Sequence, residues 1–234
     1  MGRKKDHDAK LEKKFDDGGK QKLSIDFDYR DRRTAKPVGD NSGDFTRLIA
    51  NEIQRSVPFH YETWDDVDDK YKTTLWPRIH TFFNMKPHLL GQNVKLFEEG
   101  MQAQFRSAYR NRNNKFKKEH FVDMGGYDHP EEIRNFPPGN MSLSDWHEFC
   151  NHVTSNKHMK RSQANKANRG KQLYTSNHGS KSYAQSRHEE WANGKGAYPD
   201  LIKQFKNKHV YKKGDKAGQW KSEAAEAKYL SHSF

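Results

Sequence analysis

The chain has 234 residues, and its 43 Lys and Arg residues outnumber its 31 Asp and Glu residues, which gives a formal charge of +12. This excess points to nucleic acid or another anionic surface as a partner. No stretch has the roughly 20 apolar residues that span a bilayer, so no membrane partner is expected. The single cysteine, Cys150, excludes an intrachain disulfide and a zinc site built from several cysteines.

Aromatic residues are the main source of core material, because aliphatic residues are scarce while the chain has 14 Phe, 10 Tyr and 5 Trp residues. Each aromatic side chain buries a large area and can support a small helical core. No alternating apolar run is long enough to predict a sheet. We therefore predict a mainly α protein with two small helical regions with aromatic cores, a disordered basic N-terminal arm and no substantial sheet.

The N-terminal third is expected to change from disorder to helix. Residues 1–43 alternate charges with Gly, Asp and Ser and have few apolar anchors, which predicts a disordered charged arm. Its basic cluster Arg3–Lys5 is a candidate nuclear import signal, although such clusters are common in disordered tails. The region 44–122 is predicted to be helical, beginning with Asp44 as the N-cap of a helix that Pro58 ends.

Two more helical segments follow in this region. Residues 64–83 show a helical stripe that Pro77 stops or kinks, and the carboxylates of residues 65–69 are explained by the positive end of the helix dipole. A long helix over residues 93–120 has an aromatic face and many basic residues. Its heptad pattern is short and interrupted, so self-association through a coiled coil is considered only in addition to another role for this helix.

The second half begins after a predicted linker at residues 123–140, which is rich in Pro and Gly. The region 141–234 is again predicted to be helical. A helix capped by Ser142 or Ser144 places Trp146 and Cys150 on its inward stripe. Further helices are expected at about residues 157–173, 180–192, 199–208 and 222–231.

Two basic runs without an intervening acidic residue are candidate nucleic-acid contacts, because a surface that serves only solubility mixes its signs. The alternative is a solvated helix face. The first run consists of Arg106, Arg110, Arg112, Lys115, Lys117 and Lys118. The second comprises Lys157, Lys160, Arg161, Lys166, Arg169, Lys171 and Lys181 with the polar residues Asn165, Asn168 and His178.

The second run combines charges suited to phosphates with amides that can pair with adenine edges. If it is helical, five of its residues share one face: Lys157, Arg161, Asn165, Asn168 and Gln172. For Asn165, Asn168 and His178 the alternative is that they fix a turn by hydrogen bonds to the backbone.

No catalytic or cofactor site is predicted. A metal-dependent nuclease needs carboxylates that converge from separate elements, and the acidic residues at 65–69 are adjacent on one segment. His147, Cys150, His152 and His158 are close in sequence, but known zinc-finger spacings need a second cysteine, so Cys150 is interpreted as core. A phosphate-cradling GxxxxGK[ST] loop is absent, so neither a nucleotide nor a metal cofactor is expected.

The order of motifs from Trp146 onward resembles the plant transposase family of the Ptta/En/Spm (CACTA) type. The matching residues are Trp146, Phe149, Asn165, Asn168, Arg169, His178, Gly179, Ser180, Ser182, Gly196, Pro199, Phe205, His209, Gly218 and Trp220. Residues from about 60 to 142 fit the same pattern more loosely. The short N-terminal arm and the end of the chain at Phe234 depart from the family pattern, in which relatives often continue further.

The resemblance implies a nuclear, transposon-derived protein that associates with DNA. It does not imply catalysis, because the acidic triad of such elements has no counterpart here and is expected on a separate, larger transposase protein. The first hypothesis is therefore a DNA-binding protein that recognises double-stranded DNA without cutting it. The alternatives are a catalytic subunit with metal-dependent DNA cleavage and a helical self-association protein.

Overall fold

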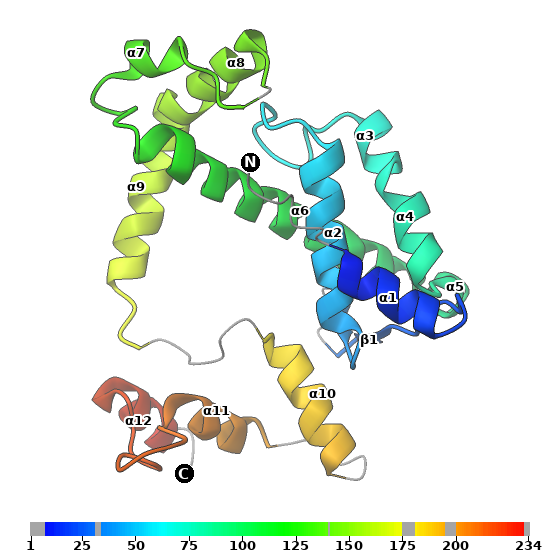
Figure 1. The fold of residues 1–234 in the computed structure, drawn as a ribbon. Helices are drawn as coiled ribbons and strands as arrows, with labels where there is room; N and C mark the ends of the chain where they lie inside the picture. The colour runs from blue at the N-terminus through cyan, green and yellow to red at the C-terminus, as the bar shows by residue number, and fades with distance from the viewer. Residues whose placement is uncertain (1–7, 31–33, 140, 175–180, 195–199, 232–234) are drawn as a thin grey trace. The chain divides into compact units, whose positions relative to one another are not determined.

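The computed structural model describes residues 8–30, 34–139, 141–174, 181–194 and 200–231. It confirms the mainly α fold, with one sheet of two short strands in these ranges (Figure 1). The contacts divide the chain into two compact units, residues 1–159 and 160–234. Each unit is described by itself. The predicted linker at 123–140 falls inside the first unit and contains the short helix α7 (Pro130–Arg134).

Helices α2 (Ser42–Ser56) and α6 (Val94–Lys117) form the centre of the first unit. The aromatic face predicted for the long helix is confirmed, since Phe97, Phe105 and Tyr109 of α6 are buried. These rings pack with the apolar face of α2, which begins two residues before the predicted Asp44 and ends before Pro58. The aromatic stripe of α6 is therefore used inside its own unit and is not available for a coiled coil.

The predicted disorder of residues 1–43 is wrong for the residues described there. They form α1 (Ala9–Asp17) and an antiparallel pair of strands, β1 (Asp26–Asp28) and β2 (Lys36–Val38), that pairs Asp26 with Val38. Most of their few apolar side chains serve the core of the first unit, and Leu11, Ile25 and Phe27 are buried in it. The low apolar content misled the prediction because this segment covers a core built by other elements instead of forming its own.

Ion pairs and close backbone packing also hold this segment in place. Arg55 of α2 forms an ion pair with the buried Asp8 at 2.6 Å. The Ala35 N–H donates to the Leu96 carbonyl at 3.1 Å. Gly100 of α6 is required at this contact, because a Cβ there would lie 2.5 Å from the Ala35 oxygen.

The segment after α2 forms two short helices where one kinked helix was predicted. Helix α3 (Asp69–Thr73) begins after Asp68, and α4 (Leu75–Phe82) contains Pro77 in its first turn, where a missing N–H costs little. The Asp66 carboxylate accepts from the Thr63 N–H at 2.9 Å and so closes a turn before α3. The short helix α5 (Lys86–Leu89) then leads to α6.

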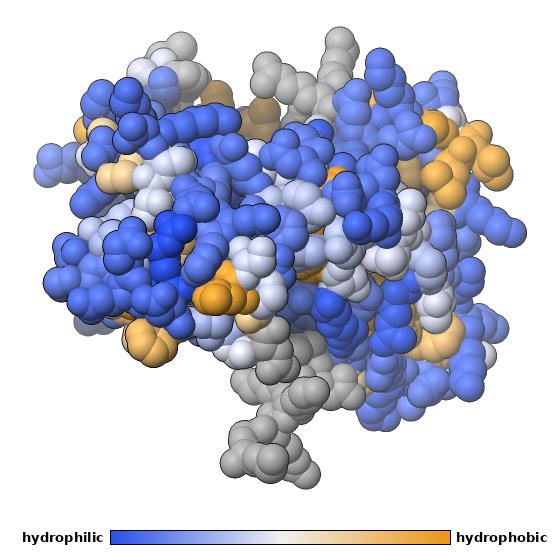
Figure 2. Space-filling view, turned by 90° about the horizontal axis from the view of Figure 1, so that it is seen from above, coloured by the Kyte–Doolittle hydropathy of each residue, from blue (hydrophilic) through white to orange (hydrophobic). Residues whose placement is uncertain are grey.

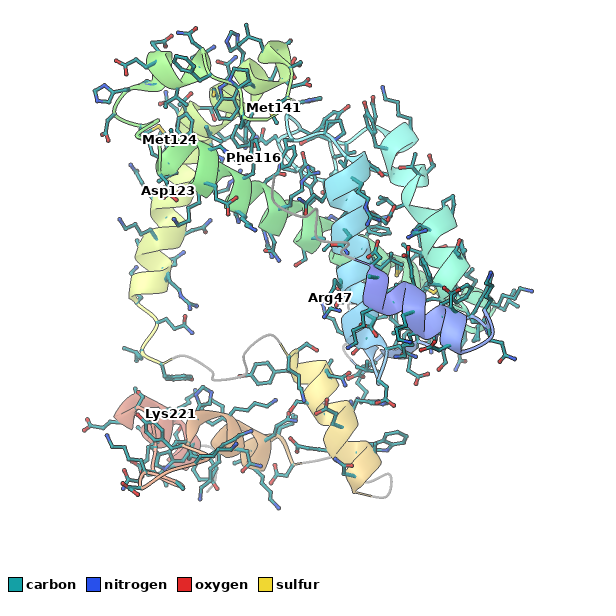
Figure 3. All side chains as sticks on the ribbon, in the orientation of Figure 1. Arg47, Phe116, Asp123, Met124, Met141 and Lys221 are labelled. Atoms are coloured by element: carbon teal, nitrogen blue, oxygen red, sulfur yellow. The ribbon has the colours of Figure 1, made fainter. Side chains whose placement is uncertain are left out.

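A smaller aromatic cluster lies where α6 ends. The helix continues as a π-helical turn, η1 (Lys118–Val122), and Phe121 of this turn is buried against Trp146 and Phe149 of α8 (Leu143–Thr154). The predicted cap is confirmed, because the Ser142 hydroxyl accepts from the Asp145 N–H at 3.1 Å. Phe116 and Met141 pack against the same cluster and lie at this junction in Figure 3.

The C-terminal unit contains short helices with little buried apolar surface. Helix α9 (Asn156–Gly170) runs from the first unit into this one, and the helices after it are α10 (Tyr183–Asn193), α11 (Leu201–His209) and α12 (Glu223–Leu230), close to the predicted ranges. The Trp220 and Tyr229 rings lie 5.2 Å apart, and a backbone bridge joins Val210 to Trp220. None of the described helices has the length and apolar character needed to cross a membrane.

Candidate nucleic-acid interface

Helix α9 (Asn156–Gly170) carries most of the second basic run and has no buried residue. Its alanines, lysines and arginines favour a helix without help from packing. The Ser155 hydroxyl accepts from the His158 N–H at 3.2 Å, which satisfies a free donor of the first turn. No acidic residue lies in α9, so the helix carries only positive charge. A helix that is polar on all sides gains nothing from a core and is suited to an external contact.

Several cations of α9 are exposed and so accessible to such a contact. Lys160 and Lys166 are exposed and make no ion pair with any residue that the structure describes. Arg169 is exposed and donates to the Gln172 side chain at 2.5 Å. Lys157 forms an ion pair with Glu62 at 3.1 Å, but its side chain remains 76% exposed, so water screens that pair.

The predicted shared face is present in α9 itself. Lys157, Arg161, Asn165 and Asn168 lie in α9 at helical spacing and are all exposed. Gln172 does not continue this face, since α9 ends at Gly170. Within the described part of the chain, the Asn165 and Asn168 amides make no hydrogen bond to the backbone, so α9 offers no support for the turn-fixing alternative for these two residues.

The first basic run, which extends from α6 into η1, differs because most of its cations have partners inside the first unit. Arg106 forms an ion pair with Asp65 at 2.8 Å, and Lys118 with Asp123 at 2.7 Å. Lys115 lies 3.7 Å from Glu119, one helical turn away. Lys117 Nζ lies 3.3 Å from His158 Nε2, and Arg110 is exposed without an ion-pair partner among the described residues.

Arg112 is a structural residue of the first unit. Its guanidinium donates to the carbonyls of Ile53, Val57 and Pro58 at 2.6, 2.5 and 2.8 Å. It also stacks on the Phe59 ring, whose centroid lies 3.9 Å from Cζ. Burial lowers the pKa of the Arg112 guanidinium, to about 10. The group stays charged at neutral pH and holds the C-terminal end of α2 against α6, so it is not placed to contact a phosphate.

The remaining predicted contacts lie after α9. Lys171 is exposed, whereas Lys181 forms an ion pair with Glu189 at 2.7 Å. The hydrogen bond from Lys181 lowers the pKa of the Glu189 carboxyl. His178 lies outside the described residues, as do Gly179 and Ser180 of the same HGSKS motif and the Arg3–Lys5 cluster. The N-cap of α10 is Ser182, whose hydroxyl accepts from the Gln185 N–H at 3.0 Å.

One buried cation was not singled out from the sequence. Lys208 of α11 is 4% exposed, and its Nζ lies 3.8 Å from the centroid of the Tyr183 ring. Desolvation, with the nearby charges of Arg187 and Lys212, lowers the Lys208 pKa to about 8, although Glu190 opposes the shift. No pattern in the sequence distinguishes this lysine from its exposed neighbours on α11.

Cys150 is buried in the aromatic cluster, as predicted. Burial raises the pKa of its thiol to about 11, so the thiol is protonated and unreactive at neutral pH.

The surface in Figure 2 is mainly hydrophilic, with small separate hydrophobic areas. Its character fits a contact made by charged and polar side chains.

Residues 143–230 match the sequence family described as plant transposase (Ptta/En/Spm family). This match confirms the resemblance for residues 143–230, from α8 to α12. It does not extend to the looser resemblance of residues 60–142. No significant match was found among curated proteins or among solved structures.

Proposed function

We propose that this chain, whose residues 143–230 are similar to plant transposases, is a nuclear protein that binds double-stranded DNA through α9. The observation that carries the proposal is a helix inside the matched region that has several exposed cations, no acidic residue and no buried residue. Duplex DNA presents regularly spaced phosphates, and lysines and arginines on one helix can neutralise several of them.

The face of α9 also suits sequence recognition. Asn165 and Asn168 lie on the same side as Lys157 and Arg161, so amides that can pair with adenine would lie beside cations that hold the backbone. Replacing Asn168 with Ala should therefore change which sequences are enriched from a random duplex pool while general affinity stays nearly constant. An unchanged enriched motif would remove Asn168 from base recognition.

The decisive experiment compares α9 with α6 at equal change of charge. One variant carries Lys160→Gln, Lys166→Gln and Arg169→Gln in α9, and the control carries Arg106→Gln and Lys115→Gln in α6 with Lys118→Gln in η1. Binding of the full chain to duplex DNA is measured between 50 and 200 mM salt. Each lost phosphate contact should reduce the salt slope by about 0.9, so the α9 variant should lose about 2.7 and the control much less.

Equal losses in the two variants would mean that only net charge matters, and the assignment of DNA contacts to α9 would be wrong. A larger loss in the α6 variant would move the interface to α6. Circular dichroism of both variants shows whether the helices persist, so that a loss of binding is not confused with unfolding.

Catalysis is assigned to a separate transposase protein in this proposal. The acidic residues at 65–69 have structural partners: Asp66 accepts from the Thr63 N–H in the turn before α3, and Asp65 pairs with Arg106 of α6. The purified chain should therefore leave supercoiled DNA intact with Mg²⁺ or Mn²⁺. Nicking by the wild-type chain that is lost on substitution of one of its own carboxylates would establish the alternative of a catalytic subunit.

A further inference from the structure

Three side chains of types that bind metals in other proteins meet in the first unit. His60 lies in the loop between α2 and α3, and Asp145 and Glu148 lie three residues apart on one face of α8. One donor atom from each of the three lies within 4.8 Å of the others. The set joins two segments that are far apart in the sequence.

The position of His60 is unusual for a histidine that only forms an ion pair. Its Nδ1 lies 3.2 Å from Asp145 Oδ1. That nitrogen is buried, yet it has no hydrogen-bond partner with acceptable geometry among the described residues. Two ligand atoms bound at about 2.0 Å to one tetrahedral ion are separated by about 3.3 Å. The separation of His60 Nδ1 from Asp145 Oδ1 and their poor hydrogen-bond alignment therefore fit two ligands of one ion better than a donor and an acceptor.

We propose that His60, Asp145 and Glu148 bind one divalent cation of the zinc class, with water in the remaining position. Imidazole and carboxylate ligands together suit Zn²⁺, and the two carboxylates balance its charge. Asp145 and His60 are already at ligand separation. Glu148 is exposed, so rotation of its side chain completes the set at small cost. The ion ties the loop before α3 to α8 and so has a structural role independent of DNA binding.

Another histidine pair supplies a matched control. His152 Nε2 and His158 Nδ1 lie 3.1 Å apart, but Lys117 Nζ lies 3.3 Å from His158 Nε2. The ammonium of Lys117 opposes a second cation there, and no carboxylate joins this pair as a third ligand within the described ranges. A search for metal binding should therefore distinguish the two histidine sites.

The test uses the full chain, freed of metal with a chelator and titrated with Co²⁺ and then Zn²⁺. Wild type and His152→Ala should bind one equivalent of Co²⁺ with the intense visible absorption of a tetrahedral site, which Zn²⁺ then bleaches. His60→Ala and the fold-sparing variant Glu148→Gln should weaken binding by at least tenfold. With saturating Zn²⁺, the melting temperature of wild type should rise by a few degrees, and that of Glu148→Gln should not.

Absence of a Co²⁺ band in wild type would overturn the proposal and leave His60 and Asp145 as an ion pair. Binding that persists in Glu148→Gln and His60→Ala but disappears in His152→Ala would also overturn it, because the site would lie at the other histidine pair. Neither result bears on DNA binding by α9, which the charge variants test separately.

Discussion

Helices α6 and α9 carry similar basic runs, yet the structure uses their charges differently. In the first run, Arg106 of α6 and Lys118 of η1 have acidic partners, and Arg112 is held by backbone carbonyls. On α9, Lys160 and Lys166 are exposed and form no ion pair with a described residue. A run of positively charged residues therefore indicates a surface for polyanions only where the fold leaves the charges without acidic partners. The runs look alike in sequence because the acidic partners of the first run lie outside it: Asp65 precedes α3, and Glu119 and Asp123 follow Lys118.

The largest effect is expected at Arg112, which distinguishes α6 most clearly from α9. Its replacement with Ala removes a donor from three carbonyl groups and a cation from the Phe59 ring. The Ile53 carbonyl keeps the Val57 N–H and the Pro58 carbonyl keeps the Tyr109 hydroxyl, so the Val57 carbonyl is the one that loses its donor. One unsatisfied group costs about 1 to 3 kcal/mol and each lost hydrogen bond about 1 kcal/mol, so the free energy of unfolding should fall by about 3 kcal/mol in urea titrations. Arg110→Ala, at an exposed site on the same helix, should change it by less than about 0.5 kcal/mol. Similar values for the two variants would contradict the structural role.

Lys208 is a second buried cation, and unlike Arg112 it has no hydrogen-bond acceptor among the described residues. Its pKa is about 8 in the folded chain and near 10.5 when exposed, so the unfolded chain binds the extra proton between these values. Stability should therefore rise as the pH increases from about 8 to 10.5, by about 2 kcal/mol, with no contribution to the slope below pH 8.

The effect of Lys208 is isolated by subtracting the pH profile of Lys208→Met from that of wild type, both measured by hydrogen exchange in α11. The difference should show the rise with pH. Lys203→Met, at an exposed position of α11, should keep the wild-type profile. If Lys208→Met also keeps it, Lys208 is not the group that titrates.

Gly100 tests how closely the N-terminal segment packs on α6. A Cβ at this position would lie 2.5 Å from the Ala35 oxygen and 2.9 Å from the Ala35 Cβ. Overpacking costs about 2 kcal/mol, and the better helix propensity of Ala returns about 1 kcal/mol, so Gly100→Ala should destabilise the chain by about 1 kcal/mol in urea titrations. Stabilisation by this substitution would show that residues 34–38 do not pack on α6 in solution.

These sites also show what the sequence could and could not predict. Helical periodicity located α2, α6 and α8 because their apolar stripes repeat within one element, and Trp146 and Cys150 were placed in a core correctly. The roles of Ala35 and Gly100 depend on a contact between segments more than 60 residues apart in the sequence, which no local pattern records. The same reason separates Arg112 from Arg110.

The smallest effect on the free energy of unfolding is expected at Arg106, which lies on the same helix as Arg112. Arg106 pairs with Asp65, but the side chains are 51% and 63% exposed, so water screens the pair and its formation costs side-chain entropy. Arg106→Ala should therefore lower the free energy of unfolding by no more than about 0.5 kcal/mol, and Asp65→Ala should have a similar small effect.

The ion pair at Arg106 also decides how the α6 charges respond to DNA. If Asp65 holds Arg106, removing the carboxylate frees one cation, so Asp65→Ala should bind duplex DNA slightly more tightly, and the double variant with Arg106→Ala should lose that gain. A loss of affinity in Arg106→Ala as large as that from a single α9 substitution would mean that α6 contacts phosphates despite its pairs. The distinction between paired and free cations would then fail as a guide to the interface.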